Sequence, residues 1–311
     1  MENLNQTSVR RFILLGFSTV PALQVVFFML FLLMYMVTLS GNLLLITLVI
    51  LHHALHTPMY FFLSNLSAID ICFSTTIVPK TLANTLSLDK TISFLGCAVQ
   101  MYFHLALGAT ECLILTVMAY DRYNAICKPL QYNTVMNPKV CLYLASGCWV
   151  LCFLHAAIHA ILTFQLPFCR SNKVNHFFCE MPPLFRLSCR DTWYNEVSVY
   201  ISGGFNALCS FFLTLVSYIH ILSTIIKIHS TTGRHKAFST CASHLTVVTL
   251  YYGTISFMYL RPQSTYSPDQ HHTGSILYTV VTPMLNPIIY SVRNKEIRKC
   301  LQKTMKSIVY T

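Results

Sequence analysis

Residues 22–50 read ALQVVFFMLFLLMYMVTLSGNLLLITLVI, and none of these side chains carries a charge. A helix rises about 1.5 Å per residue, so this stretch would extend roughly 43 Å and cross the apolar core of a bilayer, which is about 30 Å thick. A helix of this length on a water-soluble protein would show a polar face, and this one shows none. The stretch is therefore predicted to span a membrane.

Six more apolar stretches follow along the chain, at 58–86, 94–126, 140–164, 197–228, 237–260 and 272–292. Of the 311 residues, 54% are hydrophobic and only 10% are charged, whereas about 25% of the residues in soluble domains are charged. The loops between the stretches are too short to fold as separate domains. The sequence therefore predicts an all-α fold, a seven-transmembrane helix bundle with a short amphipathic helix after the seventh span.

The distribution of basic residues predicts which end of the bundle faces the cytoplasm. Lysine and arginine are enriched on the cytoplasmic side of membrane proteins, and here they gather in the tail and in the loops on its side: Arg122, Lys128, Lys139, Lys227, Arg234, Lys236, Arg293, Lys295, Arg298, Lys299, Lys303 and Lys306. We expect an extracellular N-terminus (1–21), a transmembrane domain (22–292) and a cytoplasmic tail (293–311). Asn5, in an Asn-Gln-Thr sequon, is then a candidate glycosylation site.

The net charge of +11 follows from the same basic residues. Because they lie beside apolar spans, membrane lipid with anionic headgroups and an acidic cytosolic partner are the expected binding partners, and nucleic acid is not.

Four of the 13 cysteines fall on the predicted outer side, namely Cys97, Cys169, Cys179 and Cys189. Disulfides form in that compartment, and four cysteines allow three pairings. The other nine are expected to be free apolar fillers.

Two carboxyl groups, Asp70 and Glu111, lie deep in the second and third spans. A carboxylate at the middle of the bilayer costs about 3 kcal/mol, so both groups need partners. They could share a proton or hold a cation, with Asn42 and Asn286 as possible polar neighbours. The residue types fit either possibility.

A second polar feature is Arg122, at the inner end of the third span, whose nearest candidate partner is Asp121. In the seventh span, Pro283 and Pro287 each remove one backbone hydrogen bond from successive turns. This pattern predicts a hinge, and a static kink is the alternative.

One face of the third span repeats at helical spacing and includes two small residues that leave space, Gly108 and Ala109. Similar repeats in the fifth and sixth spans carry hydroxyl and amide groups. Helix–helix contact is the alternative reading of all these positions. The candidate ligand-binding residues from these repeats are Met101, His104, Leu105, Gly108, Ala109, Ser202, Asn206, Tyr252, Ile255, Ser256 and Tyr259.

Several motifs together resemble the odorant receptors, a branch of the rhodopsin-like G-protein-coupled receptors. They are Gly41-Asn42, Leu55-His56-Thr57-Pro58-Met59-Tyr60, Met118-Ala119-Tyr120-Asp121-Arg122-Tyr123, Ser217-Tyr218, Lys236-Ala237-Phe238-Ser239-Thr240-Cys241, Ser243-His244-Leu245 and Pro283-Met284-Leu285-Asn286-Pro287-Ile288-Ile289-Tyr290. The long second outer loop resembles that of the tetrapod-type (class II) subgroup. Two residues depart from the family pattern, because Asn124 stands in place of the usual Val and Val292 in place of the usual Leu.

The resemblance implies a pocket for a small volatile odorant, to which the seventh span adds Ile276 and Thr279. It also implies that the cation held near Asp70 and Glu111 is a sodium ion. It implies disulfides between Cys97 and Cys179 and between Cys169 and Cys189. It assigns coupling to a stimulatory, olfactory-type heterotrimeric G protein and the conformational switch to Asp121, Arg122, Tyr123, Tyr218, Asn286, Pro287 and Tyr290. The implied signal is cyclic AMP, and the implied location is the plasma membrane of olfactory cilia.

Other classes of function fit the sequence less well. His155 and His159 have the spacing of a metallopeptidase helix, but residues 156 and 157 are alanine, so the catalytic glutamate is missing and no enzyme is expected. Met-His and Cys-His pairs three residues apart could bind copper, but these residue types are abundant in the chain, so no functional metal site is expected. A transporter would show paired broken helices, and only one hinge is present. Two alternatives stay open. One is a receptor of the same fold for a non-odorant small metabolite, and the other is a small-solute transporter.

In the tail, apolar residues recur at helical spacing between lysines and arginines, which predicts an interfacial helix. Cys300 within it is a candidate for palmitoylation, and apolar anchoring is the alternative.

Overall fold

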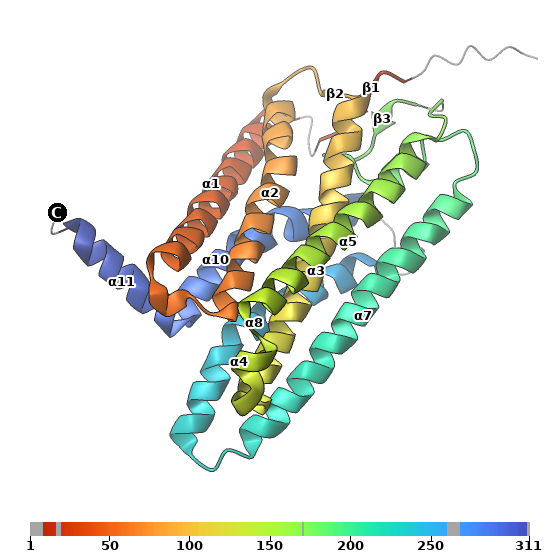
Figure 1. The fold of residues 1–311 in the computed structure, drawn as a ribbon. Helices are drawn as coiled ribbons and strands as arrows, with labels where there is room; N and C mark the ends of the chain where they lie inside the picture. The colour runs from red at the N-terminus through yellow and green to blue at the C-terminus, as the bar shows by residue number, and fades with distance from the viewer. Residues whose placement is uncertain (1–8, 17–19, 170, 260–267, 310–311) are drawn as a thin grey trace, which may run out of the picture.

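The fold was examined in a computed structural model, which describes residues 9–16, 20–169, 171–259 and 268–309. Long helices lie side by side in a bundle (Figure 1). The long helices are α1 Pro21–Leu51, α2 Pro58–Leu86, α3 Phe94–Cys127, α5 Pro138–Phe164, α7 Trp193–Ile226 and α8 Thr231–Tyr259. A final crossing combines α9 Pro268–Ile276, a π-helical turn η4 Leu277–Val281 and α10 Thr282–Arg293, and α11 Lys295–Val309 follows it.

Short elements connect these helices. They are η1 His53–Leu55, η2 Pro129–Gln131, α4 Tyr132–Val135 and α6 Met181–Phe185, together with the strands β1 Arg11–Leu14, β2 Thr91–Ser93 and β3 Lys173–Val174. The end of the bundle that carries the strands is called the outer end below, and the end that carries α4 and α11 the inner end.

Six helical segments of the described chain are long and apolar enough to cross a membrane, namely α1, α2, α3, α5, α7 and residues 272–293. The remaining predicted span, 237–260, is the sixth along the chain and corresponds to α8, which is 29 residues long. Its hydropathy is lower because Ser, Thr and Tyr side chains and His244 interrupt the apolar residues. The helix also begins six residues earlier than predicted, since its polar first turns continue it beyond the apolar stretch.

Local sequence explains where several helices begin. Pro58 and Pro138 occupy the first turns of α2 and α5, where a missing N–H is tolerated. The Asn137 side chain accepts a hydrogen bond from the backbone N–H of Val140 at 3.1 Å. Ser93 does the same for Gly96 at 3.0 Å, which caps α3.

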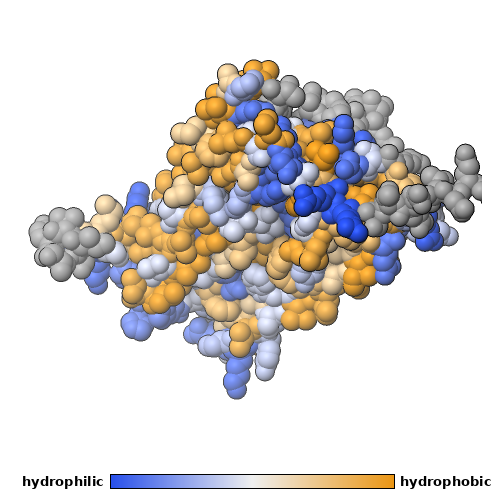
Figure 2. Space-filling view, turned by 90° about the horizontal axis from the view of Figure 1, so that it is seen from above, coloured by the Kyte–Doolittle hydropathy of each residue, from blue (hydrophilic) through white to orange (hydrophobic). Residues whose placement is uncertain are grey.

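The third helix is the centre of the bundle. In the most apolar part of α3, 61% of the residues are buried inside the protein, against 11% for α1. Exposed apolar side chains cover α1, α5 and α7, which suits contact with lipid tails. Seen from the outer end, hydrophobic side chains occupy much of the outline, one group of hydrophilic side chains lies near the centre, and others protrude at the lower and side margins (Figure 2).

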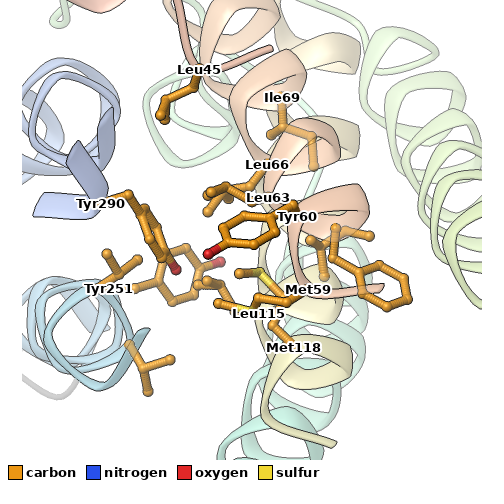
Figure 3. Close-up of a cluster of buried hydrophobic side chains, with 14 of the residues drawn as sticks. Leu45, Met59, Tyr60, Leu63, Leu66, Ile69, Leu115, Met118, Tyr251 and Tyr290 are labelled. Atoms are coloured by element: carbon orange, nitrogen blue, oxygen red, sulfur yellow. The ribbon is translucent and has the colours of Figure 1, made fainter. Parts of the chain in front are cut away.

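The largest cluster of buried apolar side chains in the described part of the protein joins α1, α2, α3, α5, α8 and α10, and it extends from the inner end to Phe177 and Phe178 near the outer end. Figure 3 shows Tyr251 and Tyr290 reaching from α8 and α10 towards Tyr60 and Leu115. Tyr251 and Tyr290 are fully buried. This cluster continues to α11, whose Ile297 and Cys300 are buried in it. The Thr304 hydroxyl also lies 2.9 Å from Nε2 of His52, so α11 packs against the start of the first inner loop.

A small β-sheet at the outer end was not predicted from the sequence. Strand β1 lies between the other two, antiparallel to β2 and parallel to β3. Phe12 and Leu14 of β1 are buried in an outer apolar cluster with Phe168 and Leu184. Strands of two to four residues are too short to show a clear alternation in the sequence, and so the N-terminal stretch gave no strand signal.

The two prolines of the last crossing lie in different helical surroundings. The helix α10 runs through Pro287, and the π-helical turn comes just before Pro283. Because Pro287 cannot donate to the Pro283 carbonyl, that oxygen is left over, and the Asn42 amide of α1 donates to it at 3.2 Å. A Cβ on Gly41 would lie 2.9 Å from the Pro287 ring. Gly41 and Asn42 thus allow α1 to pack closely on α10.

Candidate functional site

A cross-linked loop covers the outer end of the bundle. Disulfides join Cys97 to Cys179, with 5.4 Å between their Cα atoms, and Cys169 to Cys189, with 5.8 Å. These are the two pairs that the family resemblance implied. All 13 cysteines lie in the described residues, and the other nine are free thiols. Gln100 of α3 also holds the loop, because its Oε1 accepts from the Cys179 backbone N–H at 2.9 Å.

Residues just before α6 fix this loop to the last crossing. Its described residues, 165–169 and 171–192, are called the outer lid below. Nε2 of His176 lies 3.6 Å from the Glu180 carboxylate and 3.2 Å from the Ser275 hydroxyl. The rings of His176 and His272 are 4.9 Å apart. Burial raises the pKa of the Glu180 carboxyl to about 7.

Beneath the lid, His104 of α3 is enclosed by aromatic rings. Its ring centroid lies 4.9 Å from Phe178 of the lid, 5.4 Å from Phe73 of α2 and 6.3 Å from Tyr278 of the last crossing. The side chain is buried, and its Nδ1 has no hydrogen-bond partner in the described part of the protein. A buried polar atom without a partner costs about 1–3 kcal/mol, and a bound polar group would relieve this cost.

The expectation that Gly108 leaves open space is wrong. The space is filled, because a Cβ at Gly108 would collide with the Tyr278 hydroxyl and come within 3.7 Å of Phe73. The Gly108 carbonyl accepts a hydrogen bond from the Tyr251 hydroxyl at 3.0 Å. The glycine therefore permits close packing of α8 and the last crossing against α3.

The other predicted pocket residues differ in their surroundings. Met101 is fully buried in the outer apolar cluster, where the partly buried Leu105 packs against it. The Tyr252 hydroxyl lies 3.7 Å from Sγ of Cys112. The hydroxyl of Thr279 is bonded to its own helix at the Ser275 carbonyl. Ala109, Asn206, Ile255 and Ile276 are partly buried, and Ser256 is exposed.

Two predicted residues cannot be placed, since Asn5 and the side chain of Tyr259 lie outside the described residues. Ser202 faces α5, because its hydroxyl lies 2.9 Å from Nε2 of His159. A small cavity of about 20 Å³ lies between α1, α2 and the lid, lined by Asn84 and Phe177 among others. None of the predicted pocket residues lines it.

In the middle of the bundle, Asp70 and Asn286 are in contact. The Asn286 amide donates to both carboxylate oxygens of Asp70, at 3.1 and 3.0 Å. It also interacts with the carboxyl group of Glu111. Oε1 of Glu111 and Oδ1 of Asn286 are buried without a partner among the described residues. The structure thus brings together the two acids and Asn286, whereas Asn42 bonds elsewhere, to α10.

At the inner end, Arg122 and Asp121 form an ion pair. Nε of Arg122 donates to Oδ2 of Asp121 at 3.0 Å. The other carboxylate oxygen accepts from the Tyr132 hydroxyl of α4 at 2.7 Å. Both charged residues are buried. The departure from the family pattern at Asn124 does not disturb this pair, since the Asn124 amide donates to the Tyr120 carbonyl of its own helix at 2.9 Å.

A second polar link at the inner end joins three helices. The Tyr218 hydroxyl of α7 lies 2.6 Å from Nδ1 of His244 in α8, and Nε2 of His244 lies 3.1 Å from the Leu115 carbonyl of α3. A carbonyl only accepts, so His244 carries its proton on Nε2, and the Tyr218 hydroxyl donates to Nδ1. The Tyr290 hydroxyl is buried and has no partner among the residues that the structure describes. Tyr123 lies beside them, with its ring 5.8 Å from that of His220.

Comparisons with known proteins identify the family. The sequence model described as olfactory receptor matches residues 31–307. Similar proteins include olfactory receptor 5AP2 of Mus musculus, 50% identical over 99% of this chain and 98% of that protein. Olfactory receptor 5L2 of Homo sapiens is 50% identical over 99% of both chains, and olfactory receptor 5B12 of Homo sapiens is 49% identical over 97% of this chain and 96% of its own.

The chain belongs to the olfactory receptor family. Olfactory receptors are G-protein-coupled receptors, so the predicted seven-helix fold is confirmed and the protein is not an enzyme. It is a multi-pass membrane protein that, as its family implies, responds to odorants and couples to a G protein.

Sequence reasoning missed two residues at the inner end of this olfactory receptor. Tyr132 follows Asp121 by 11 residues across a loop, and no spacing rule indicates that the two meet. His244 stands in a family motif, but a histidine in an apolar helix does not reveal which neighbours it bonds. The lid residues Phe178 and Glu180 were missed for the same reason.

Proposed function

We propose that this olfactory receptor binds a small volatile molecule in the outer half of the bundle, beside His104, and activates a stimulatory heterotrimeric G protein that raises cyclic AMP. The N-terminus is extracellular, and the protein acts in the plasma membrane of olfactory cilia. The observation that carries the proposal is the buried, unpartnered Nδ1 of His104 beneath the lid. Its aromatic surroundings suit an odorant with an apolar body and one polar group.

At the inner end of α3, the ion pair between Arg122 and Asp121 supports the interpretation that this structure is the inactive state of the receptor. Arg122 points its charge at its own helix partner, so it is not free for a G protein. Activation would move α8 away from α3, and the link of His244 to the Leu115 carbonyl would then break. Tyr218 and Tyr290 would turn towards Arg122 and stabilise it in the released position.

Replacing His104 with phenylalanine tests the ligand site. An aromatic ring, slightly larger than imidazole, remains to pack on Phe73 and Phe178, and the polar nitrogen atoms are lost. For odorants with a hydroxyl or acid group we expect the half-maximal concentration in a cyclic AMP assay to rise roughly tenfold, the equivalent of one hydrogen bond. Hydrocarbon odorants should change little. An unchanged ranking of ligands from a diverse panel would place the pocket elsewhere.

We also propose a sodium ion as an allosteric ligand of Asp70 and Glu111. Their oxygen atoms and Oδ1 of Asn286 are suitable ligands, and the unpartnered Glu111 and Asn286 oxygens support the proposal. In sodium chloride the purified receptor should melt about 2 °C higher than in choline chloride of equal ionic strength. Glu111→Gln should abolish this difference, whereas Glu296→Gln on α11 should retain it. A difference that survives in Glu111→Gln would exclude the site.

A further inference from the structure

Three polar atoms from two helices converge in the outer half of the bundle, away from His104. Nε2 of His159 on α5 lies 3.1 Å from Nε2 of His155, one turn earlier on the same helix. It also lies 2.9 Å from Oγ of Ser202 on α7. His159 is buried and His155 is partly buried. The three residues therefore connect α5 and α7 where these helices face each other.

The positions of the protons in this cluster follow from one neighbouring contact. Oγ of Ser202 lies 2.7 Å from the Ser198 carbonyl, which can only accept, so the hydroxyl proton of Ser202 is used there. Towards His159, Ser202 then presents a lone pair, and His159 must carry its proton on Nε2. If Nε2 of His155 also carried a proton, that proton would point at the one on Nε2 of His159. Nε2 of His155 therefore presents a lone pair, like the Ser202 oxygen. One proton therefore lies among three atoms that can all bind a cation.

The separation of the two imidazole nitrogens matches that of two ligands on one metal ion. With metal–nitrogen bonds of about 2.0–2.1 Å, a nitrogen separation of 3.1 Å corresponds to an angle of roughly 100° at the metal, between the tetrahedral and square-planar values. A spacing of four residues brings both rings to one face of α5. Neutral imidazole is a preferred ligand of zinc and copper ions.

We propose that His155, His159 and Ser202 form a binding site for a divalent transition-metal ion of the zinc type. The ion takes the place of the shared proton, which moves to Nδ1 of His159 so that this imidazole stays neutral. The ion then binds both Nε2 atoms and the Ser202 oxygen, with water as a further ligand. No three His, Cys, Asp or Glu side chains cluster in the described residues, so a hydroxyl supplies the third donor. Because the donors come from α5 and α7, the bound ion would fix the spacing of these two helices.

A zinc titration of the full-length receptor in lipid nanodiscs tests the site. Zinc chloride at 100 µM should raise the melting temperature by about 3 °C or more, and magnesium chloride should not, since magnesium prefers oxygen ligands. His155→Gln should abolish the shift. His53→Gln is the matched control, because His53 and His56 also place ring nitrogens 3.2 Å apart, but exposed and at the inner end.

A gain-of-function variant guards against a trivial loss of folding. Ser202→Cys replaces a weak hydroxyl ligand with a thiolate, so the zinc concentration for half the shift should fall roughly tenfold or more. The exposed thiols Cys72 and Cys209 are present in every variant and do not affect the comparison. The proposal is overturned if wild-type receptor shows no zinc shift, if His155→Gln keeps it, or if Ser202→Cys leaves the zinc dependence unchanged.

Discussion

A receptor with Cys97 replaced by serine is expected to be nearly absent from the cell surface. The Cys97–Cys179 disulfide closes a loop of 82 residues, and such a cross-link stabilises a fold by about 4.5 kcal/mol in the chain-entropy model. That is a large fraction of the 5–15 kcal/mol that typically separates folded from unfolded proteins. Surface labelling with an antibody against an N-terminal tag, normalised to total expression, gives the measurement.

Four other cysteine variants provide the comparison. Cys179→Ser should match Cys97→Ser, and the double variant should be no worse than either, because all three remove the same bond. Cys169→Ser breaks a loop of only 20 residues, so its defect should be smaller, about 3 kcal/mol. Cys72→Ser removes an exposed free thiol and should be neutral. Normal surface levels for Cys97→Ser would refute the structural role of this bond.

The second large effect is expected at Arg122. Replacing it with alanine removes the proposed contact with the G protein, and loss of one partner of a buried charged contact costs about 2–5 kcal/mol. A cyclic AMP response reduced by roughly 30-fold or more is therefore expected at equal surface expression. Asp121 would keep only its hydrogen bond from Tyr132, so surface expression must be measured in the same cells.

An exposed arginine at the same end of the molecule controls for charge alone. Arg298 lies on the exposed side of α11, and Arg298→Ala removes one positive charge without touching α3. This variant should signal like the parent receptor. If Arg122→Ala signals as strongly as Arg298→Ala, the proposed role of the Asp121–Arg122 pair is wrong.

The sequence was sufficient to locate the bundle because each crossing is defined by its own apolar residues. The predicted 58–86 and observed Pro58–Leu86 agree, whereas α1 is longer than predicted by one residue at each end and α3 by one residue at its C-terminal end. The prediction was poorer for α8, whose polar first turns are helical although they carry no apolar signal. It failed for β1, which is stabilised by pairing with residues about 80 and 160 positions away.

The candidate site was predictable only in part, for a physical reason. Helical spacing indicates which side chains share a face, but it does not indicate what occupies the space in front of them. Gly108 illustrates this, because the expected gap is filled by Tyr278 from a crossing 170 residues later. The contact of Asp70 with Asn286 could be anticipated, since buried polar groups need partners and the membrane offers few. Tyr132 begins the short helix α4, outside the predicted membrane spans, where no such constraint applies.

The central place of β1 in the outer sheet has a consequence for protein engineering. A strand with neighbours on both sides leaves neither edge bare, and a receptor trimmed past Leu14 would expose the edges of β2 and β3 together. Bare edges invite pairing with other chains and hence aggregation. Fusion partners and epitope tags therefore belong ahead of Arg11, and shortened versions of this receptor should keep the strand intact.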